Sequence, residues 1–205
     1  MAVTDLFQSP ALYIAFQRLI GGARMRSVCL RKLAPKEGER ILDIGCGPAY
    51  YLPEMPSVDY HGFDTDAPYI EYARSRFGRL GTFHCETFSA EHAARLGHFD
   101  GVLLMGLLHH LDDEACNTVL RLVASVLKPE GRAIALDTTL HKGQNRLERM
   151  MAVRDRGKYV RRPEEFEALA KSWFGSVEGS VSAERFFPAI HWSMTMRRPR
   201  KPERR

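Results

Sequence analysis

Apolar residues recur in two distinct patterns over the first two thirds of the chain. Short, nearly continuous apolar runs predict buried strands, whereas apolar residues at helical spacing predict helices. We expect strands at residues 40–44, 59–64, 82–85, 99–105 and 132–137, and helices at 10–33 (with a break at Gly21-Gly22), 68–77 and 112–127. Strands that alternate with helices in this way form a parallel sheet with helices on both faces.

The pattern changes after residue 140. Residues 147–153 and 164–173 have helical spacing, whereas 176–182 and 190–196 alternate around Phe186-Phe187-Pro188, which is typical of an antiparallel hairpin. Residues 128–131, Lys-Pro-Glu-Gly, are expected to form a turn, because proline and glycine end helices. Together these elements predict a Rossmann-like, doubly wound α/β fold. Its seven-stranded sheet is mostly parallel and ends in an antiparallel C-terminal hairpin.

The net positive charge of the chain comes from its C-terminal end. Residues 197–205 hold six basic residues and one acid, which leaves 24 basic and 24 acidic residues for the other 196. We expect residues 1–35 to form a helical N-terminal lid, residues 36–196 the α/β domain and residues 197–205 a disordered basic tail. Such a tail can contact nucleic acid or anionic membranes, but a neutral domain without a basic stripe argues against a nucleic-acid partner.

Other classes of protein are disfavoured by what the sequence lacks. It has no apolar run of the roughly 18–20 residues that a membrane span needs, and no basic-then-apolar secretory signal at its start. Its four cysteines show no metal-binding spacing. We therefore expect a cytoplasmic protein with reduced thiols, no metal and no membrane partner.

A glycine-rich segment directly follows the first predicted strand. Gly45 and Gly47 permit positive φ and let the backbone approach a ligand closely. The third glycine of a dinucleotide-binding loop would fall on Tyr50, whose bulk obstructs tight packing of helix on strand. The loop therefore disfavours NAD and FAD.

An acidic residue ends the next predicted strand. Asp64 is placed where a carboxylate can accept hydrogen bonds from ribose hydroxyls. The alternative is that Asp64 caps the following helix, a role that Asp66 could fill equally well.

Four segments, in order, resemble motifs of the class I S-adenosylmethionine (SAM)-dependent methyltransferases, particularly the small-molecule type. They are Ile41-Leu-Asp-Ile-Gly-Cys-Gly-Pro48, Tyr60-His-Gly-Phe-Asp64, residues 99–112 and Leu127-Lys-Pro-Glu-Gly-Arg132. The resemblance implies SAM as cofactor and methyl transfer to an oxygen or nitrogen of a small molecule. The alternatives are a nucleic-acid methyltransferase that uses the basic tail and a non-catalytic SAM-binding module. Residues 105–108 lack the Asn/Asp-Pro-Pro-aromatic pattern usual in enzymes that methylate base amines.

The resemblance also implies roles for individual residues. Asp43 and the loop backbone would hold the amino-acid end of SAM, Asp64 the ribose and Glu86 the adenine amino group. The full set implied to bind the cofactor is Asp43, Gly45, Cys46, Gly47, Asp64, Thr65, Glu86, Thr87 and Met105.

The catalytic chemistry is less strongly indicated by the sequence. Methyl transfer depends mainly on alignment of the reactants, and a general base helps where the acceptor must lose a proton. His109 and His110, just past the fourth strand, are candidates for that base, although one of them could merely orient a loop. A metal site from these histidines and neighbouring acids is disfavoured, because adjacent side chains seldom converge on one ion.

The acceptor pocket must come from the less familiar parts of the chain. The candidate residues are Tyr13, Gln17, His141 and His191. Residues 154–162 are rich in arginine and either bind an anionic acceptor or form a solvated surface loop, and we favour the loop.

Overall fold

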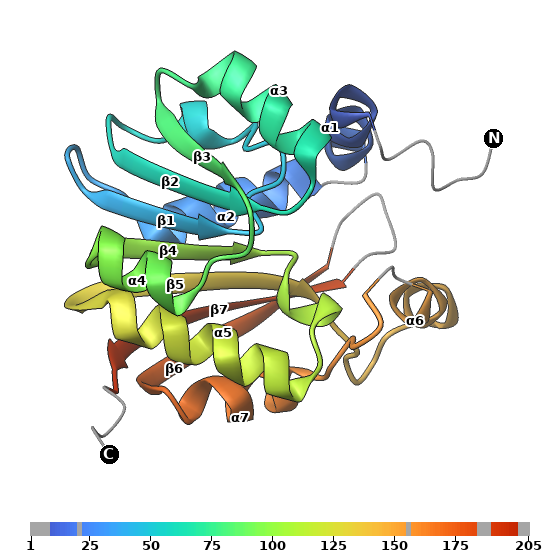
Figure 1. The fold of residues 1–205 in the computed structure, drawn as a ribbon. Coiled ribbons are helices and arrows are strands. Elements are labelled where there is room, and N and C mark those ends of the chain that lie inside the picture. The colour runs from blue at the N-terminus through green and yellow to red at the C-terminus, as the bar shows by residue number, and fades with distance from the viewer. Residues whose placement is uncertain (1–8, 20–21, 155–156, 184–189, 201–205) are drawn as a thin grey trace.

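A computed structural model describes residues 9–19, 22–154, 157–183 and 190–200. Its strands form one seven-stranded sheet in the order β3-β2-β1-β4-β5-β7-β6 (Figure 1). Neighbouring strands from β3 to β5 are parallel, whereas β7 is antiparallel to both β5 and β6. This confirms the Rossmann-like fold. The strands are β1 (Arg40–Ile44), β2 (Asp59–Asp64), β3 (Gly81–Cys85), β4 (Phe99–Met105), β5 (Leu127–Thr138), β6 (Phe174–Ala183) and β7 (Ile190–Pro199).

Helices cover both faces of the sheet, and α6 lies beyond the carboxyl ends of the parallel strands (Figure 1). On one face lie α1 (Pro10–Leu19), α2 (Gly22–Leu33) and α3 (Ala67–Phe77). On the other face lie α4 (Ala90–Leu96), α5 (Asp113–Val126) and α7 (Pro163–Lys171). The remaining elements are α6 (Arg146–Val153) and the short 3₁₀ helices η2 (Leu52–Glu54) and η3 (Leu108–His110).

The central strands β1 and β4 are mostly apolar because both of their faces are covered. Leu42 and Leu104 enter a core cluster with α5 and α7, whereas Ile41 and Leu103 enter a second cluster with α2 and α3. Successive side chains of a strand point to opposite faces, so neighbouring residues supply two separate cores. This arrangement fixes the strand ends, which carry the loops of the candidate site.

One predicted turn is wrong. Residues 128–131 do not separate the helix from the strand, because β5 begins at Leu127 and includes them. Leu127 pairs with Phe99 and Arg132 pairs with Gly101, with a register shift between these pairs. The extra residues, including the proline and glycine that predicted a turn, are thus absorbed in a bulge of the strand.

The parts at the two ends differ in detail from the sequence prediction. α2 buries Met25, Cys29 and Leu33 in the core, so this half of residues 1–35 packs as a covering helix of the sheet. β7 extends past residue 196 to Pro199. α4 was not predicted, and the proposed turn at Phe186-Phe187-Pro188 lies outside the described residues. Among the residues that the structure describes, no helix is both long and apolar enough to span a membrane.

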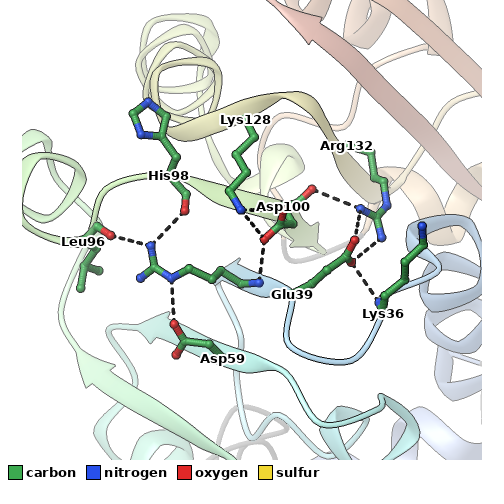
Figure 2. A network of polar contacts seen from close by, with 9 residues as sticks. Lys36, Glu39, Asp59, Leu96, His98, Asp100, Lys128 and Arg132 are labelled. Carbon is green, nitrogen blue, oxygen red and sulfur yellow. Dashed lines mark hydrogen bonds and ion pairs between the residues drawn. The ribbon is translucent and has the colours of Figure 1, made fainter.

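A network of charged residues closes the amino edge of the sheet, at the starts of the parallel strands (Figure 2). Arg40 Nε lies 2.8 Å from Asp59 Oδ2, Lys128 Nζ lies 2.8 Å from Asp100 Oδ1, and Arg132 Nη2 lies 2.7 Å from Glu39 Oε2. Arg40 also donates to the carbonyls of residues 96 and 98, and Arg132 to those of residues 33 and 34. The network therefore ties the strand starts to the ends of α2 and α4.

Candidate cofactor and active site

The loop after β1 adopts a backbone conformation that few residues tolerate. Gly45, Gly47 and Ala49 all have positive φ, of 77°, 54° and 48°. The amides of Gly45 and Cys46 both donate to the carbonyl of Phe63, at 2.8 and 3.1 Å, so the loop curls over the end of β2. Glycine at the first two positions avoids the steric cost of a side chain in this region.

Asp64 fastens that loop to the end of β2. Its Oδ2 accepts a hydrogen bond from the amide of Gly47 at 2.8 Å, and its Oδ1 accepts one from the amide of Asp66 at 2.9 Å. The cap of α3 is Asp66, which accepts from the amide of Tyr69 at 3.1 Å. Burial raises the pKa of Asp64, and the two amides partly offset this. The structure thus gives the capping role to Asp66 and leaves Asp64 on the wall of a cavity.

Asp43 lies beneath the loop and is fully buried. Its Oδ2 accepts hydrogen bonds from the hydroxyls of Tyr51 at 2.7 Å and Tyr60 at 2.8 Å. Burial raises its pKa to about 6, although these hydrogen bonds and the charge of Arg26 oppose the rise. Asp43 does not line the cavity, and it contacts the loop through Tyr51, whose hydroxyl also lies 3.3 Å from the carbonyl of Cys46. Its role toward the cofactor stays a prediction.

A cavity of about 1010 Å³ opens at the carboxyl ends of β1, β2, β4 and β5. It brings together most of the residues that the sequence singled out, while His141 is exposed in a turn away from it, its amide donating to Gln144 Oε1. The predicted residues on the cavity wall are Tyr13, Gln17, Gly45, Cys46, Gly47, Asp64, Thr65, Glu86, Thr87, Met105, His109, His110 and His191.

Glu86 lies at the exposed rim of this cavity, just past β3. Its Oε1 is 3.3 Å from Nε2 of His92 and 3.8 Å from Nδ1 of His84. Burial lowers the pKa of His84, which favours its neutral form. The carboxylate is therefore held between two imidazoles at the end of the cavity where β2 and β3 meet.

His109 is the buried member of the histidine pair, and His110 is exposed. Nδ1 of His109 lies 2.8 Å from Oδ1 of Asp137, and the backbone amide of His109 donates to the same oxygen at 3.1 Å. Asp137 is itself buried at the end of β5. Since a carboxylate can only accept, Nδ1 carries the hydrogen in this pair.

The segment before α7 holds the turn that carries His109. A Cβ built on Gly157 would lie 2.0 Å from Cδ2 of His109, so any side chain at residue 157 would displace the ring. The amide of Tyr159 donates to the carbonyl of His109 at 3.0 Å. Arg161 donates to the carbonyls of Leu108 and Leu111, at 3.0 and 2.7 Å, and lies 2.7 Å from Asp113 Oδ1. These contacts hold η3 in addition to the contact of His109 with Asp137 on β5.

Sequence reasoning missed three residues that shape this site. Asp137 was noted only as the end of a strand, yet an acid at the carboxyl end of a central strand is a detectable signal. Arg161 belongs to the basic stretch for which we favoured a solvated loop; that reading fails for this residue, which is 8% exposed and paired. Arg26 lines the cavity from α2, and nothing in its helical spacing distinguished it from the surface arginines nearby.

Trp192 on β7 belongs to the core cluster. Among the residues that the structure describes, no group of three or more His, Cys, Asp or Glu side chains is placed to hold a metal ion.

Comparison with known proteins gives the family. Residues 41–131 match a family described as a methyltransferase domain. A tRNA U34 carboxymethyltransferase from Syntrophotalea carbinolica is 32% identical over 121 residues, covering 56% of this chain and 36% of that protein. A ubiquinone biosynthesis O-methyltransferase from Thiobacillus denitrificans is 34% identical over 117 residues, covering 55% and 49%. The matches thus span half or less of these curated relatives.

Among solved structures, phosphoethanolamine N-methyltransferase 2 of Haemonchus contortus, in complex with S-adenosyl-L-methionine, has a TM-score of 0.69. It is 17% identical, and the match covers 95% of this chain and 58% of that chain. At this identity the likeness shows the fold. The matched domain, the strand order and the loop geometry agree with the four motifs. Residues 41–131 therefore form a methyltransferase domain of the class I SAM-dependent type, with SAM as its cofactor.

Proposed function

We propose that the chain transfers the methyl group of SAM to an oxygen or nitrogen of a small-molecule acceptor. The observation that carries this proposal is the extent of the cavity, which runs from the glycine loop past His109 to α5 and α6. Pockets for a single small ligand measure roughly 300–1,000 Å³. At about 1010 Å³, this one is large enough to enclose an acceptor beside the cofactor.

The residues on the β1 and β2 side of the cavity fit SAM. Gly45 and Gly47 would let the backbone approach the amino-acid end of SAM. Asp64 and Glu86 line the cavity, and they would accept hydrogen bonds from the ribose hydroxyls and from the adenine amine, respectively. Bound SAM would supply a methyl group on a positively charged sulfur, a reactive donor. The main task of the protein is then to align the acceptor with that methyl group.

The opposite side of the cavity suggests the character of the acceptor. Leu111, Val119 and Leu122 line it near α5, and Met150 and Met151 line it from α6. Apolar walls with a few polar groups favour a ligand with an apolar body and one reactive polar atom. We infer an acceptor of this type.

We assign His109 as the general base. When the acceptor oxygen or nitrogen bonds to the methyl group, its proton must leave, and the imidazole of His109 lines the cavity where the two halves meet. Because Nδ1 donates to Asp137, the proton would be taken by Nε2. Asp137 then orients the ring and stabilises the imidazolium that forms, so it is a positioning residue.

The activity is tested by incubating the protein with methyl-labelled SAM and a metabolite extract, and then searching for labelled products by mass spectrometry. We expect label in one or a few small molecules. If SAM binds in calorimetry but no product is labelled, the chain is a SAM-binding module instead. If SAM does not bind at all, the proposal fails.

The role of His109 is tested by measuring the rate at which variants form the labelled product found in that experiment. His109→Gln should lower kcat by about 10²–10⁴-fold without a comparable change in SAM affinity. The matched control is His110→Gln, which alters the exposed neighbour. Asp137→Asn should lower kcat and shift the pH profile, because an amide no longer favours the charged ring. Equal kcat values for His109→Gln and the control would exclude His109 as the base.

A nucleic-acid acceptor is the second candidate, since one relative is a tRNA U34 carboxymethyltransferase. The same labelled SAM is incubated with total RNA in parallel. Label in RNA but not in metabolites would replace the small-molecule proposal, and would predict binding that weakens steeply with salt.

A further inference from the structure

Arg26 is a buried cation that contacts neutral groups, although its charge also acts on the buried Asp43. It is 9% exposed, and its guanidinium donates to Gln17 Oε1 at 2.8 Å, Tyr13 Oη at 3.0 Å and the carbonyl of Gly22 at 3.4 Å. All of these partners are neutral. Among the residues that the structure describes, no carboxylate forms an ion pair with Arg26. A buried charge is normally paired, because desolvation without an opposite charge is costly.

Two other arginines with little exposure each form an ion pair with a carboxylate of this chain. Arg161 is 8% exposed and lies 2.7 Å from a carboxylate oxygen of Asp113. Arg132, whose side chain is 11% exposed, lies 2.7 Å from a carboxylate oxygen of Glu39. Arg26 differs from both in that it lines the cofactor cavity. Its missing counterion is thus expected on the ligand.

The position of Arg26 identifies which part of the ligand it meets. A Cβ built on Gly106, which follows β4, would lie 4.0 Å from Nη2 of Arg26. Gly106 and the glycine loop after β1 are at neighbouring strand ends, since β1 pairs with β4. The guanidinium is therefore at the loop end of the cavity, away from Glu86 beyond β3. The amino-acid end of SAM, with its α-carboxylate, is expected at this end.

The partners of Arg26 add a consequence for α1. Tyr13 and Gln17 both belong to that helix, so the guanidinium holds α1 against α2. Other contacts of α1 include those of its buried residue Ile14 and of the ring of Tyr13, which lies 5.2 Å from that of Tyr69. Leu12 and Leu19 are exposed, at 47% and 81%. Fixing the guanidinium should therefore also fix α1 over the cavity.

We propose that Arg26 binds the α-carboxylate of SAM and, through Tyr13 and Gln17, makes α1 a lid whose closure depends on that carboxylate. The proposal rests on SAM as the ligand of this cavity. A planar guanidinium has N–H donors on all three of its nitrogens, so Arg26 can keep its bonds to α1 and still donate to a carboxylate. A ligand that closes the lid must bind the closed form of the protein more tightly than the open form. The contact of its carboxylate with Arg26 supplies this difference in affinity.

Calorimetry with SAM and decarboxylated SAM tests the first part, because the two ligands differ only in the carboxylate. Arg26→Gln should weaken SAM binding roughly 10–100-fold and change the binding of decarboxylated SAM less than about threefold. The control is Arg24→Gln, an exposed arginine on the same helix, which should change neither. Equal losses for both ligands, or no loss for SAM, would overturn the proposal.

Two further measurements keep the test decisive. If Arg26→Gln does not fold, the wild-type protein should still prefer SAM to its decarboxylated form by about 10-fold or more, and Arg26→Lys should reduce that preference. Hydrogen exchange should show residues 10–19 protected by SAM but much less by decarboxylated SAM. Equal protection by the two ligands would exclude the lid. If the wild-type protein binds neither ligand, SAM is not the ligand of this cavity, and the proposed function fails as well.

Discussion

The two edges of the sheet carry similar residues in opposite states. At the amino edge, Arg132, Lys128 and Arg40 each form an ion pair with a carboxylate within the chain (Figure 2). At the carboxyl edge, Asp43 and Asp64 accept hydrogen bonds from hydroxyls and amides, and Arg26 donates to neutral groups, so none of the three is in an ion pair among the described residues. The ion pairs of the first edge need no ligand, whereas Asp64 and Arg26 at the second edge line the cavity, where a ligand can contact them.

The pKa shifts follow the same division. Burial tends to raise the pKa of Glu39 and of Asp100, but hydrogen bonds from Arg132 and Lys128 outweigh it and lower both pKa values. Burial raises the pKa of Asp43 and of Asp64, and their neutral partners do not cancel it. Acid therefore removes stability at the amino edge, where carboxylates lose their ion pairs, and restores it at Asp43. The direction of the pKa shift thus separates the ion-paired carboxylates of the amino edge from the two carboxylates next to the glycine loop.

The largest expected effect is at the amino edge. Arg132→Ala should lower the free energy of unfolding by about 3–4 kcal/mol, because Glu39 is left without its partner and two carbonyls lose a donor. Urea denaturation measures this change. The affinity for SAM should stay within about twofold, since Arg132 lies at the far edge of the sheet. A comparable loss of affinity would break the distinction between the two edges.

The next effect concerns the charge beneath the glycine loop. The pKa of Asp43 in the folded protein, about 6, lies above the ordinary value of 3.8 for an aspartate, so the folded protein holds this proton more tightly. Stability from Asp43 is thus lost as pH rises from about 4 to 6. Relative to the wild type, Asp43→Asn should gain up to about 3 kcal/mol over this range. Denaturation of both proteins at pH 4 and pH 7 measures the difference, and a constant difference would contradict the assignment.

At the carboxyl edge, ligand binding should change more than stability. Asp64→Asn removes the charge that accepts from the ribose, and should weaken SAM binding roughly 10–100-fold. The free energy of unfolding should change by less than about 1.5 kcal/mol, because the amide can still accept one of the two backbone hydrogen bonds. Calorimetry and denaturation on the same preparations give both values. Unchanged affinity would remove Asp64 from the cofactor site.

The smallest expected effect sharpens the comparison within the amino edge. Asp59 is half exposed and pairs with Arg40, which lowers its pKa. Exposed ion pairs contribute little, so Asp59→Asn should cost less than about 1 kcal/mol and the cost should fall at high salt. A loss as large as that of Arg132→Ala would mean that exposure does not separate the strong contacts of this network from the weak ones.

The sequence was most informative where one physical cause decides the structure. The continuous apolar runs of β1 and β4 predicted buried strands because both faces of the sheet are covered. The positions of Gly45, Gly47 and Asp64 predicted a ligand loop, since strand ends in a parallel sheet meet at one edge. These features depend on short stretches of chain and a regular topology.

The features that could not be predicted from the sequence depend on contacts between residues far apart in the chain. α4 has no buried residue, so its sequence carries no helical stripe. The bulge that absorbs residues 128–131 exists because Leu127 pairs with Phe99, which no local pattern shows. Likewise, the pairing of His109 with Asp137 joins residues 28 positions apart. Burial of an arginine such as Arg161 cannot be read from a basic stretch, since its carboxylate lies on another element.

The place of β7 in the sheet has a consequence for how the chain folds during synthesis. β7 follows β6 along the chain but lies between β5 and β6, and it is the strand with which β6 pairs. Until residues 190–199 have left the ribosome, β5 keeps an open hydrogen-bonding edge and β6 lacks its neighbour. Such edges invite pairing with other chains. The nascent protein should therefore need protection from aggregation at this late stage, and an interrupted translation product should be its most aggregation-prone form.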